Sequence, residues 1–206
     1  MNDIIDIYDK YAPEYADTIL TSDTHSHRFD QLQKNHVRNH ARILDLGCGP
    51  GNRMSAFWKN DPTCTLTGVD LSESMLDIAR QTVPKATLLH QDMRSLDLIQ
   101  RFEVILLPHS IIHLTLRETA QIMAKLSTML CPGGILFISF IELHCSWLNT
   151  RRFFPPCLPV LNQDRHDIAS LITSCSISIV EEDEELFIEQ DGTPTTDVFL
   201  IGRKKS

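Results

Sequence analysis

The stretch Ile43-Leu44-Asp45-Leu46-Gly47-Cys48-Gly49-Pro50-Gly51-Asn52 decides the fold of this 206-residue chain. Its apolar first half predicts a buried strand over 42–46, and the glycines that follow predict a tight turn into a helix over about 52–60. Glycine lets a ligand approach the main chain closely, and the free N–H groups at a helix start face such a ligand. We therefore expect a ligand-binding loop between this strand and this helix.

The spacing of the glycines differs from the dinucleotide-binding fingerprint G-x-G-x-x-G. That fingerprint needs a small residue at position 52, where this chain has Asn52. From Asp45 to Gly51 the pattern is D-x-G-x-G-x-G instead.

Short apolar runs and helical stretches alternate on the carboxyl side of this loop. They predict strands over 65–69, 86–89, 103–107 and 135–140, with helices over about 73–82 and 116–130. Ser72 is placed to cap the first of these helices, and Pro132-Gly133-Gly134 is placed to turn the chain after the second. Strands that alternate with helices indicate βαβ units and a parallel sheet.

The two ends of the chain have other patterns. Residues 1–40 are helical in pattern, and the proline-rich stretch within 141–163 predicts an irregular insertion. A helix near 164–174 and strands over about 176–188 and 196–203 follow, and the turn Asp191-Gly192-Thr193-Pro194 predicts an antiparallel hairpin. We expect a single domain, 1–206, made of an N-terminal helical lid (1–40), a binding core (41–140), the insertion (141–163) and a C-terminal helix and hairpin (164–206).

Composition and charge narrow the class of partner. The net charge of −8, without a basic stripe, disfavours nucleic acid, because binding to phosphates needs clustered lysine and arginine. No segment has the roughly 20 consecutive apolar residues of a membrane helix, and the acidic start Met1-Asn2-Asp3-Ile4-Ile5-Asp6 does not have the pattern of a secretory signal, so we expect a cytoplasmic protein without a membrane partner. The acidic run 181–185 is expected to form a solvated face. The sequence does not indicate the oligomeric state.

Neither cysteines nor histidines form a recognisable metal motif. The six cysteines form no C-x-x-C pair, so we expect reduced thiols. His36 and His40 have the spacing of zinc ligands on a helix, but the intervening Val37-Arg38-Asn39 lacks the glutamate of a metalloprotease helix. We expect a solvated helical face there and no metal.

Further motifs follow the glycine loop in a fixed order. They are Gly68-Val69-Asp70-Leu71-Ser72-Glu73-Ser74-Met75-Leu76, His90-Gln91-Asp92-Met93-Arg94, Phe102-Glu103-Val104-Ile105-Leu106-Leu107 and Leu130-Cys131-Pro132-Gly133-Gly134. Together with the loop, they resemble the class I methyltransferases that use S-adenosylmethionine (SAM). The resemblance covers about residues 40–140. It implies a Rossmann-like α/β fold with a mainly parallel seven-stranded sheet, helices on both faces and an antiparallel C-terminal hairpin.

The resemblance also implies how SAM, and its product S-adenosylhomocysteine (SAH), would be held. Asp70 would accept hydrogen bonds from both ribose hydroxyls, and Asp92 would accept one from the adenine amino group while the backbone amide of Met93 reads the ring. Asp45 would approach the methionine amino group. The amides of Gly47, Cys48 and Gly49 would lie beneath the sugar and the methionine moiety. Leu71, Met75 and Leu107 complete the apolar set, although helical spacing alone places Met75 in the core. Arg28 is assigned to the methionine carboxylate by position only.

The acceptor side is less defined. His109 lies just after the fourth predicted strand, a position that faces the methyl group in the family, so it is a candidate base or a backbone contributor. His113 matches a histidine of small bacterial members and is either a base or a structural residue. Tyr8, Tyr11 and Tyr15 share one face of a helix that Pro13 interrupts. This face either docks on the core or forms a lid whose tyrosines, Tyr15 among them, cover SAM and line the acceptor pocket. Arg152-Phe153-Phe154 is a candidate wall of that pocket.

Four functions remain open at this point. The first is methyl transfer to a small molecule, mainly by placement of the reactants, and the second is methyl transfer to RNA or protein. The second would need a basic face or a motif such as N-P-P-Y, where this chain has Leu107-Pro108-His109-Ser110. The third is a SAM-binding module without catalysis, and the fourth is an NAD-dependent oxidoreductase.

Overall fold

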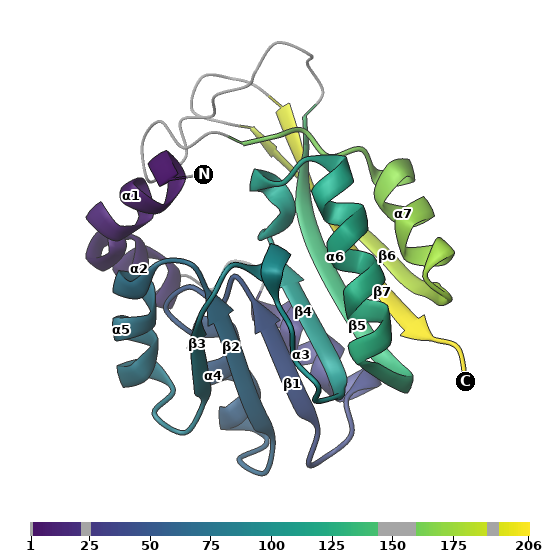
Figure 1. The fold of residues 1–206 in the computed structure, drawn as a ribbon, viewed down its shortest axis with the longest axis horizontal. Coiled ribbons are helices and arrows are strands. Elements are labelled where there is room, and N and C mark those ends of the chain that lie inside the picture. Colours follow the sequence, from purple (N-terminus) through teal and green to yellow (C-terminus); the bar gives the residue numbers. More distant parts are fainter. Residues whose placement is uncertain (1, 22–25, 144–159, 189–193) are drawn as a thin grey trace.

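A seven-stranded sheet with the spatial order β3-β2-β1-β4-β5-β7-β6 forms the centre of the protein (Figure 1). The computed structural model describes residues 2–21, 26–143, 160–188 and 194–206. The strands are β1 (Arg42–Leu46), β2 (Thr65–Asp70), β3 (Thr87–His90), β4 (Phe102–Pro108), β5 (Leu130–Leu143), β6 (Ile177–Ile188) and β7 (Pro194–Lys204). Strands β1 to β5 are parallel, and β7 runs antiparallel to both β5 and β6. The expected Rossmann-like α/β fold is confirmed.

Helices cover both faces of this sheet, as expected. On one face, α3 (Ser26–His36), α4 (Asn52–Asn60) and α5 (Glu73–Thr82) pack against an apolar cluster that includes Phe137 and Phe199. On the other face, α6 (Leu116–Met129) and α7 (Arg165–Ser174) pack against a cluster that includes Leu107 and Leu136. Two short 3₁₀ helices, η1 (Met93–Ser95) and η2 (Ile111–His113), follow β3 and β4. Figure 1 shows α6 and α7 in front of the sheet, with α3 and α4 behind it.

The order of the strands places a cleft at the carboxyl ends of β1 and β4. Strand β1 pairs with β2 on one side and with β4 on the other, so the chain winds away from this point in both directions. In open α/β sheets, ligands bind at this reversal because the loops after the two strands separate there. The loop that contains Gly47, Gly49 and Gly51 leaves β1 at this point.

The N-terminal segment forms two helices instead of one. Helix α1 (Asn2–Lys10) ends before Tyr11, and α2 (Ala12–Thr21) begins with Pro13 in its first turn. Proline is tolerated in a first turn because its missing N–H would have no helical partner there. Both helices contact α5, and both contribute side chains to the region at the carboxyl ends of the parallel strands.

The start of β5 differs from the sequence prediction, and the acidic run 181–185 is largely exposed as expected but also forms ion pairs. Strand β5 begins at Leu130, so Pro132-Gly133-Gly134 lies within an irregular strand and not in a turn before it, with a register shift opposite Phe102 and Val104. The run 181–185 is not merely solvated, because its side chains alternate between the two faces of the edge strand β6. Glu181, Asp183 and Glu185 contact His36 and Arg28, whereas Glu182 and Glu184 contact Arg165.

The histidine pair also lies differently. Helix α3 ends at His36, and His40 has a left-handed φ of 62°, so the two side chains do not share a helical face. Among the described residues, no group of three or more His, Cys, Asp or Glu side chains is arranged to hold a metal ion. The thiols of Cys48, Cys64, Cys131 and Cys175 are free. No helix in the described part of the chain is long and apolar enough to cross a membrane. The Arg152-Phe153-Phe154 segment and the tip of the hairpin lie outside the described residues.

Candidate functional site

A pocket of about 920 Å³, its open mouth included, lies at the carboxyl ends of the parallel strands. Its wall comes from the loops after β1, β2, β3 and β4, and from helices α1 and α2. The lining residues are Ile4, Ile5, Tyr8, Tyr15, Gly47, Gly49, Val69, Asp70, Leu71, Ser72, Met75, Gln91, Asp92, Met93, Pro108, His109, Ser110, Ile112, His113 and Leu114. Most of the predicted nucleoside-binding residues therefore meet in one pocket of the size that small ligands occupy.

Backbone N–H groups of the glycine loop donate hydrogen bonds to the neighbouring strand β2. The N–H groups of Gly47 and Cys48 donate to the Val69 carbonyl at 2.8 and 3.1 Å, and the N–H of Gly49 donates to Asp70 Oδ2 at 2.7 Å. All three amides thus have partners within the protein, and Gly47 and Gly49 line the pocket. Gly47 has a φ of 71°, and a Cβ there would lie 2.7 Å from Ser110 Cβ, so the position needs glycine.

Asp70 links that loop to the following helix. Its carboxylate accepts the N–H of Gly49 and, at 2.9 Å, the N–H of Ser72, the residue that caps α5. Burial raises the pKa of Asp70, and the backbone hydrogen bonds oppose this rise by stabilising the charged form. Each oxygen keeps acceptor capacity beyond its one backbone bond. The carboxylate can therefore accept hydroxyl groups from a ligand in the pocket.

Asp45 is fully buried behind the glycine loop. Neither of its carboxylate oxygens has a hydrogen-bond partner among the described residues. Burial raises its pKa to about 7, while the positive charge of Arg53 lowers it and the negative charge of Asp70 raises it. Asp45 is not in the pocket wall, but an unpartnered carboxylate at this depth suits a cationic group at the end of the pocket.

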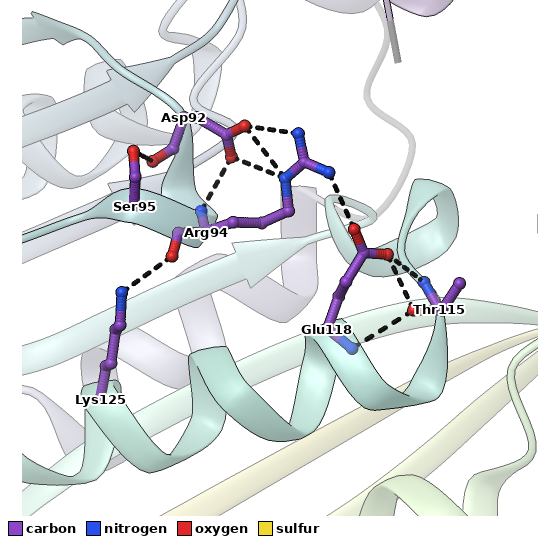
Figure 2. Close-up of polar contacts among 6 residues, drawn as sticks. All are labelled: Asp92, Arg94, Ser95, Thr115, Glu118 and Lys125. Carbon is purple, nitrogen blue, oxygen red and sulfur yellow. Dashed lines mark hydrogen bonds and ion pairs between the residues drawn. The ribbon is translucent and has the colours of Figure 1, made fainter.

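The floor opposite the glycine loop combines apolar and acidic groups. Met75 is 2% exposed and also lines the pocket. It therefore lies both in the core and at the pocket wall, the two positions expected from the sequence. Leu71 and Met93 also line the pocket. Asp92 lines it as well, and Figure 2 shows its carboxylate gripped by the guanidinium of Arg94.

Helices α1 and α2 form one side of the pocket. Tyr8 and Tyr15 line it with their rings edge to face at 5.6 Å, whereas Tyr11 lies outside the wall, so two of the three tyrosines contribute to it. The N–H groups of Tyr11 and Tyr15 donate to the carbonyls of Ile7 and Tyr11, so helical hydrogen bonding continues across the junction of α1 and α2. Burial raises the pKa of Tyr8 and of Tyr15, so both phenols stay neutral. Asp9 fixes α1 in place by accepting the hydroxyl of Ser72 at 2.5 Å.

The two histidines of the acceptor side both line the pocket and have polar partners. Nδ1 of His109 lies 3.1 Å from the Ser139 hydroxyl, and its Nε2 lies 3.4 Å from Asp197 Oδ2. Nε2 of His113 lies 3.0 Å from the Tyr8 hydroxyl. These contacts fix both rings at the pocket wall, and His113 also joins the wall to α1.

Besides Asp45, three predicted binding residues lie outside the pocket wall. Leu107 is fully buried in the apolar cluster beneath α6, because it belongs to a strand that is covered on both faces. The next residue, Pro108, lines the pocket instead. Arg28 is also outside the wall. Its guanidinium pairs with Asp183 and Glu185 and lies 4.0 Å from the Phe199 ring, so it is held against the sheet. Cys48 is 3% exposed, and its side chain is a small filler against Gly68.

Several wall residues were not predicted from the sequence. Ile4 and Ile5 belong to α1, and Gln91, Ser110 and Ile112 follow β3 and β4. The only available signal for the last three was their place directly after a predicted strand. Nothing in the sequence pattern indicates that α1 folds over the pocket with its isoleucines inward.

The described residues fit an adenosyl group. The wall supplies a carboxylate beside the glycine loop (Asp70), an apolar floor (Met75) and a second carboxylate (Asp92), and a buried unpartnered carboxylate (Asp45) lies behind the loop. These groups match ribose hydroxyls, a purine face, an exocyclic amine and a positively charged methionine moiety, in that order.

Comparison with known proteins agrees with this arrangement. The family model described as "Methyltransferase domain" matches residues 43–134. The chain is 28% identical to trans-aconitate 2-methyltransferase of Escherichia coli over 113 residues, which cover 55% of this chain and 43% of that protein. It is 32% identical to trans-aconitate 2-methyltransferase of Variovorax paradoxus over 98 residues, which cover 48% of this chain and 38% of that protein. The matches thus span less than half of these relatives' own lengths.

The same fold occurs in solved structures. Magnesium protoporphyrin IX methyltransferase from Synechocystis, with bound SAH, superposes with a TM-score of 0.76 over 99% of both chains, at 15% sequence identity. The superposition extends beyond residues 43–134, the part of the chain that the family model matches.

Proposed function

We propose that this chain, whose residues 43–134 match the family model of a methyltransferase domain, is a class I SAM-dependent methyltransferase that transfers the methyl group of SAM to a small molecule. The observation that carries the proposal is the pair formed by Asp70 and the glycine loop. A carboxylate at the end of β2 accepts the N–H of Gly49, which belongs to the loop after β1, and both residues line one pocket. This pair places a fixed acceptor for ribose hydroxyls beside a turn that a ligand can approach closely.

SAM supplies a methyl group on a positively charged sulfur, which an acceptor atom attacks in line to give SAH and a methylated product. The residues of the chain would contribute binding and orientation. Asp70 would hold the ribose, Met75 would pack on the base and Asp45 would face the methionine amino group. Placement of reactants about 3–3.5 Å apart supplies most of the acceleration such a reaction needs.

The histidines are placed to shape the acceptor side. The contacts of His109 with Ser139 and Asp197, and of His113 with Tyr8, orient the two rings at the pocket wall. A general base adds about 10²- to 10⁴-fold when the acceptor must lose a proton. We propose that positioning comes first and that either histidine adds a base function according to the acceptor.

Two features support a small acceptor. The net charge of −8 opposes a polyanionic substrate, and α1 and α2 close one side of the pocket. The curated relatives named above are methyltransferases of a small molecule, trans-aconitate, and that substrate is theirs. We assign to this chain the broader class of small-molecule acceptors.

Ligand-dependent thermal stability tests the donor site. We expect SAM and SAH to raise the melting temperature and NAD to leave it unchanged, with about 2.7 kcal/mol of added stability at a ligand concentration 100 times the dissociation constant. Asp70→Ala should abolish the shift. The matched control is Asp77→Ala on the exposed side of α5, where the carboxylate pairs with Arg80, and its shift should equal that of the wild type.

A panel of small acceptors, scored by SAH release, tests catalysis. Release of SAH with at least one acceptor supports the proposal, and His109→Ala and His113→Ala then show whether a base participates. Binding of NAD without binding of SAM would overturn the assignment. Binding of SAM without turnover across the panel would favour a binding module.

A further inference from the structure

Asp92 and Arg94 form a tight pair at the end of β3 (Figure 2). The guanidinium Nε of Arg94 lies 3.0 Å from both carboxylate oxygens of Asp92, and its Nη2 lies 2.6 Å from Oδ2. The backbone N–H of Arg94 also donates to Oδ1 at 2.8 Å. Asp92 lines the pocket, so its carboxylate gives this part of the wall a negative charge. The pair with Arg94 fixes the orientation of that carboxylate.

The other end of the Arg94 guanidinium is anchored on α6. Its Nη1 donates to Glu118 Oε1 at 2.8 Å, while Glu118 Oε2 accepts the N–H and the hydroxyl of Thr115 at 2.9 and 2.8 Å. Thr115 and Glu118 form the capping box that starts α6. Lys125, two turns further along α6, donates to the Arg94 carbonyl at 2.8 Å. Arg94 is thus held at both its main chain and its side chain by one rigid helix.

Counting the acceptor sites of Asp92 shows what remains for a ligand. A carboxylate has about four lone-pair sites, and the backbone N–H, Nε and Nη2 of Arg94 take about three of them. About one lone-pair site of the Asp92 carboxylate is left. A ligand group with an N–H donor can bond there, whereas a ligand group that is itself an acceptor is repelled by the carboxylate. The exocyclic amino group of adenine is such a donor, whereas the carbonyl of a deaminated purine is an acceptor.

We propose that Arg94 is a positioning residue for purine recognition, which orients Asp92 so that the pocket accepts a 6-amino purine and rejects a 6-oxo purine. The inference rests on the proposed function, because it takes the adenosyl group as the ligand. Arg94 does not line the pocket, so it acts through Asp92. The Arg94 hydrogen bonds also lower the pKa of Asp92, which keeps the carboxylate charged and therefore an acceptor only.

Substitution at position 94 should leave folding largely intact. The side chains of Arg94, Asp92 and Glu118 are 33%, 26% and 28% exposed, and partly exposed ion pairs add little to stability. The capping box of α6 does not need the arginine, because Thr115 and Glu118 bond to each other directly. The ligand-free variant is therefore a valid reference for binding.

The test compares two ligands by calorimetry, SAH and its deaminated analogue S-inosylhomocysteine. In Arg94→Gln we expect SAH to bind about tenfold more weakly, the scale of one hydrogen bond to a charged group. The affinity for S-inosylhomocysteine should stay within about twofold of the wild-type value, so the preference for the 6-amino purine shrinks by most of that factor. Glu118→Gln, which loosens only the far anchor, should shift the preference in the same direction by a smaller factor.

Arg80→Gln is the matched control, since Arg80 forms ion pairs with Glu73 and Asp77 on the surface of α5. It should bind both ligands as the wild type does. An equal loss of both ligands in Arg94→Gln, or an unchanged preference, overturns the positioning role. If Arg94→Gln does not fold, the Glu118→Gln preference decides, and an unchanged preference there overturns the role as well. Failure of the wild type to bind SAH at all would instead refute the proposed function.

Discussion

At the scale of single residues, Asp45 is a carboxylate with 0% exposure and no hydrogen-bond partner among the described residues. Because burial raises its pKa to about 7, it is largely protonated below that pH and charged above it. A ligand that carries an ammonium group favours the charged form. The affinity for such a ligand should therefore depend on pH through this one residue.

We expect the affinity for SAH to rise between pH 6 and pH 8, by at most about tenfold per pH unit below the pKa of Asp45. Asp45→Asn keeps the shape of the side chain and removes its charge. It should weaken binding at pH 8 by about tenfold and show a flatter pH dependence. Calorimetry at pH 6, 7 and 8 measures both effects, and equal slopes in the two proteins would show that another group titrates.

The sequence predicted those residues whose chemistry depends on their place along a strand. Asp70 is the last residue of β2 and Asp92 lies two residues after β3, so their position at the carboxyl edge of the sheet follows from the parallel order of the strands. Arg28 was placed incorrectly because its partners, Asp183 and Glu185, lie about 155 residues away in the chain. The grip of Arg94 on Asp92 was likewise invisible, since it depends on side-chain directions and on Glu118 of α6.

At the scale of secondary-structure elements, α1 is joined to the pocket by two polar contacts. The Tyr8 hydroxyl bonds to His113 at 3.0 Å, and Asp9 accepts the hydroxyl of Ser72 at 2.5 Å. The isoleucines Ile4 and Ile5 of the same helix line the pocket. These contacts hold α1 against the pocket, so weakening them should speed the release of a ligand.

Tyr8→Phe removes one of these contacts and keeps the ring. We expect SAH to dissociate about fivefold faster, which corresponds to about 1 kcal/mol for one hydrogen bond. Stopped-flow displacement of SAH measures the rate. Tyr11→Phe is the control, because Tyr11 lies outside the pocket wall, and it should release SAH at the wild-type rate. A similar acceleration in both variants would show that the contact with His113 does not retain the ligand.

The strand and helix positions were largely predictable, whereas the path of α1 was not. Helices α4 and α5 begin and end where their capping and apolar periodicity indicate, and β1 matches its prediction over 42–46. The extension of β5 back to Leu130 was missed because Pro132-Gly133-Gly134 reads as a turn. In the structure the pairing with β4 passes from Leu130 directly to Ile135, and Gly133 between them has a left-handed φ of 74°.

At the scale of the whole molecule, two groups of carboxylates give opposite contributions to stability. Burial raises the pKa of Asp45 to about 7, so the native state binds more protons than the unfolded state between about pH 4 and 7, and stability falls as the pH rises through that window. The hydrogen bond from Arg42 lowers the pKa of Glu103 to about 2, and the Thr115 amide, with Arg94, lowers that of Glu118 to about 2. Their contribution is complete above about pH 4.5 and is lost as the pH falls towards 2.

The free energy of unfolding of the ligand-free protein should therefore be greatest between about pH 4 and 6. Urea titrations from pH 3 to pH 8 measure this profile. Asp45→Asn should reduce the loss of stability at pH values above the maximum, and Glu103→Gln should reduce the loss of stability at pH values below it. A maximum above pH 7 would contradict the assigned shift of Asp45.

The alternating carboxylates of β6 also affect how molecules meet one another. Strand β6 is the outermost strand on its side, and an unpaired strand border can template the addition of a neighbour's backbone. Here, any incoming strand would lie beside the five consecutive acidic side chains of residues 181–185. Three of them pair with Arg28 and His36 on one face of the sheet, and two pair with Arg165 on the other. Such a border disfavours the addition of a strand from a second acidic chain.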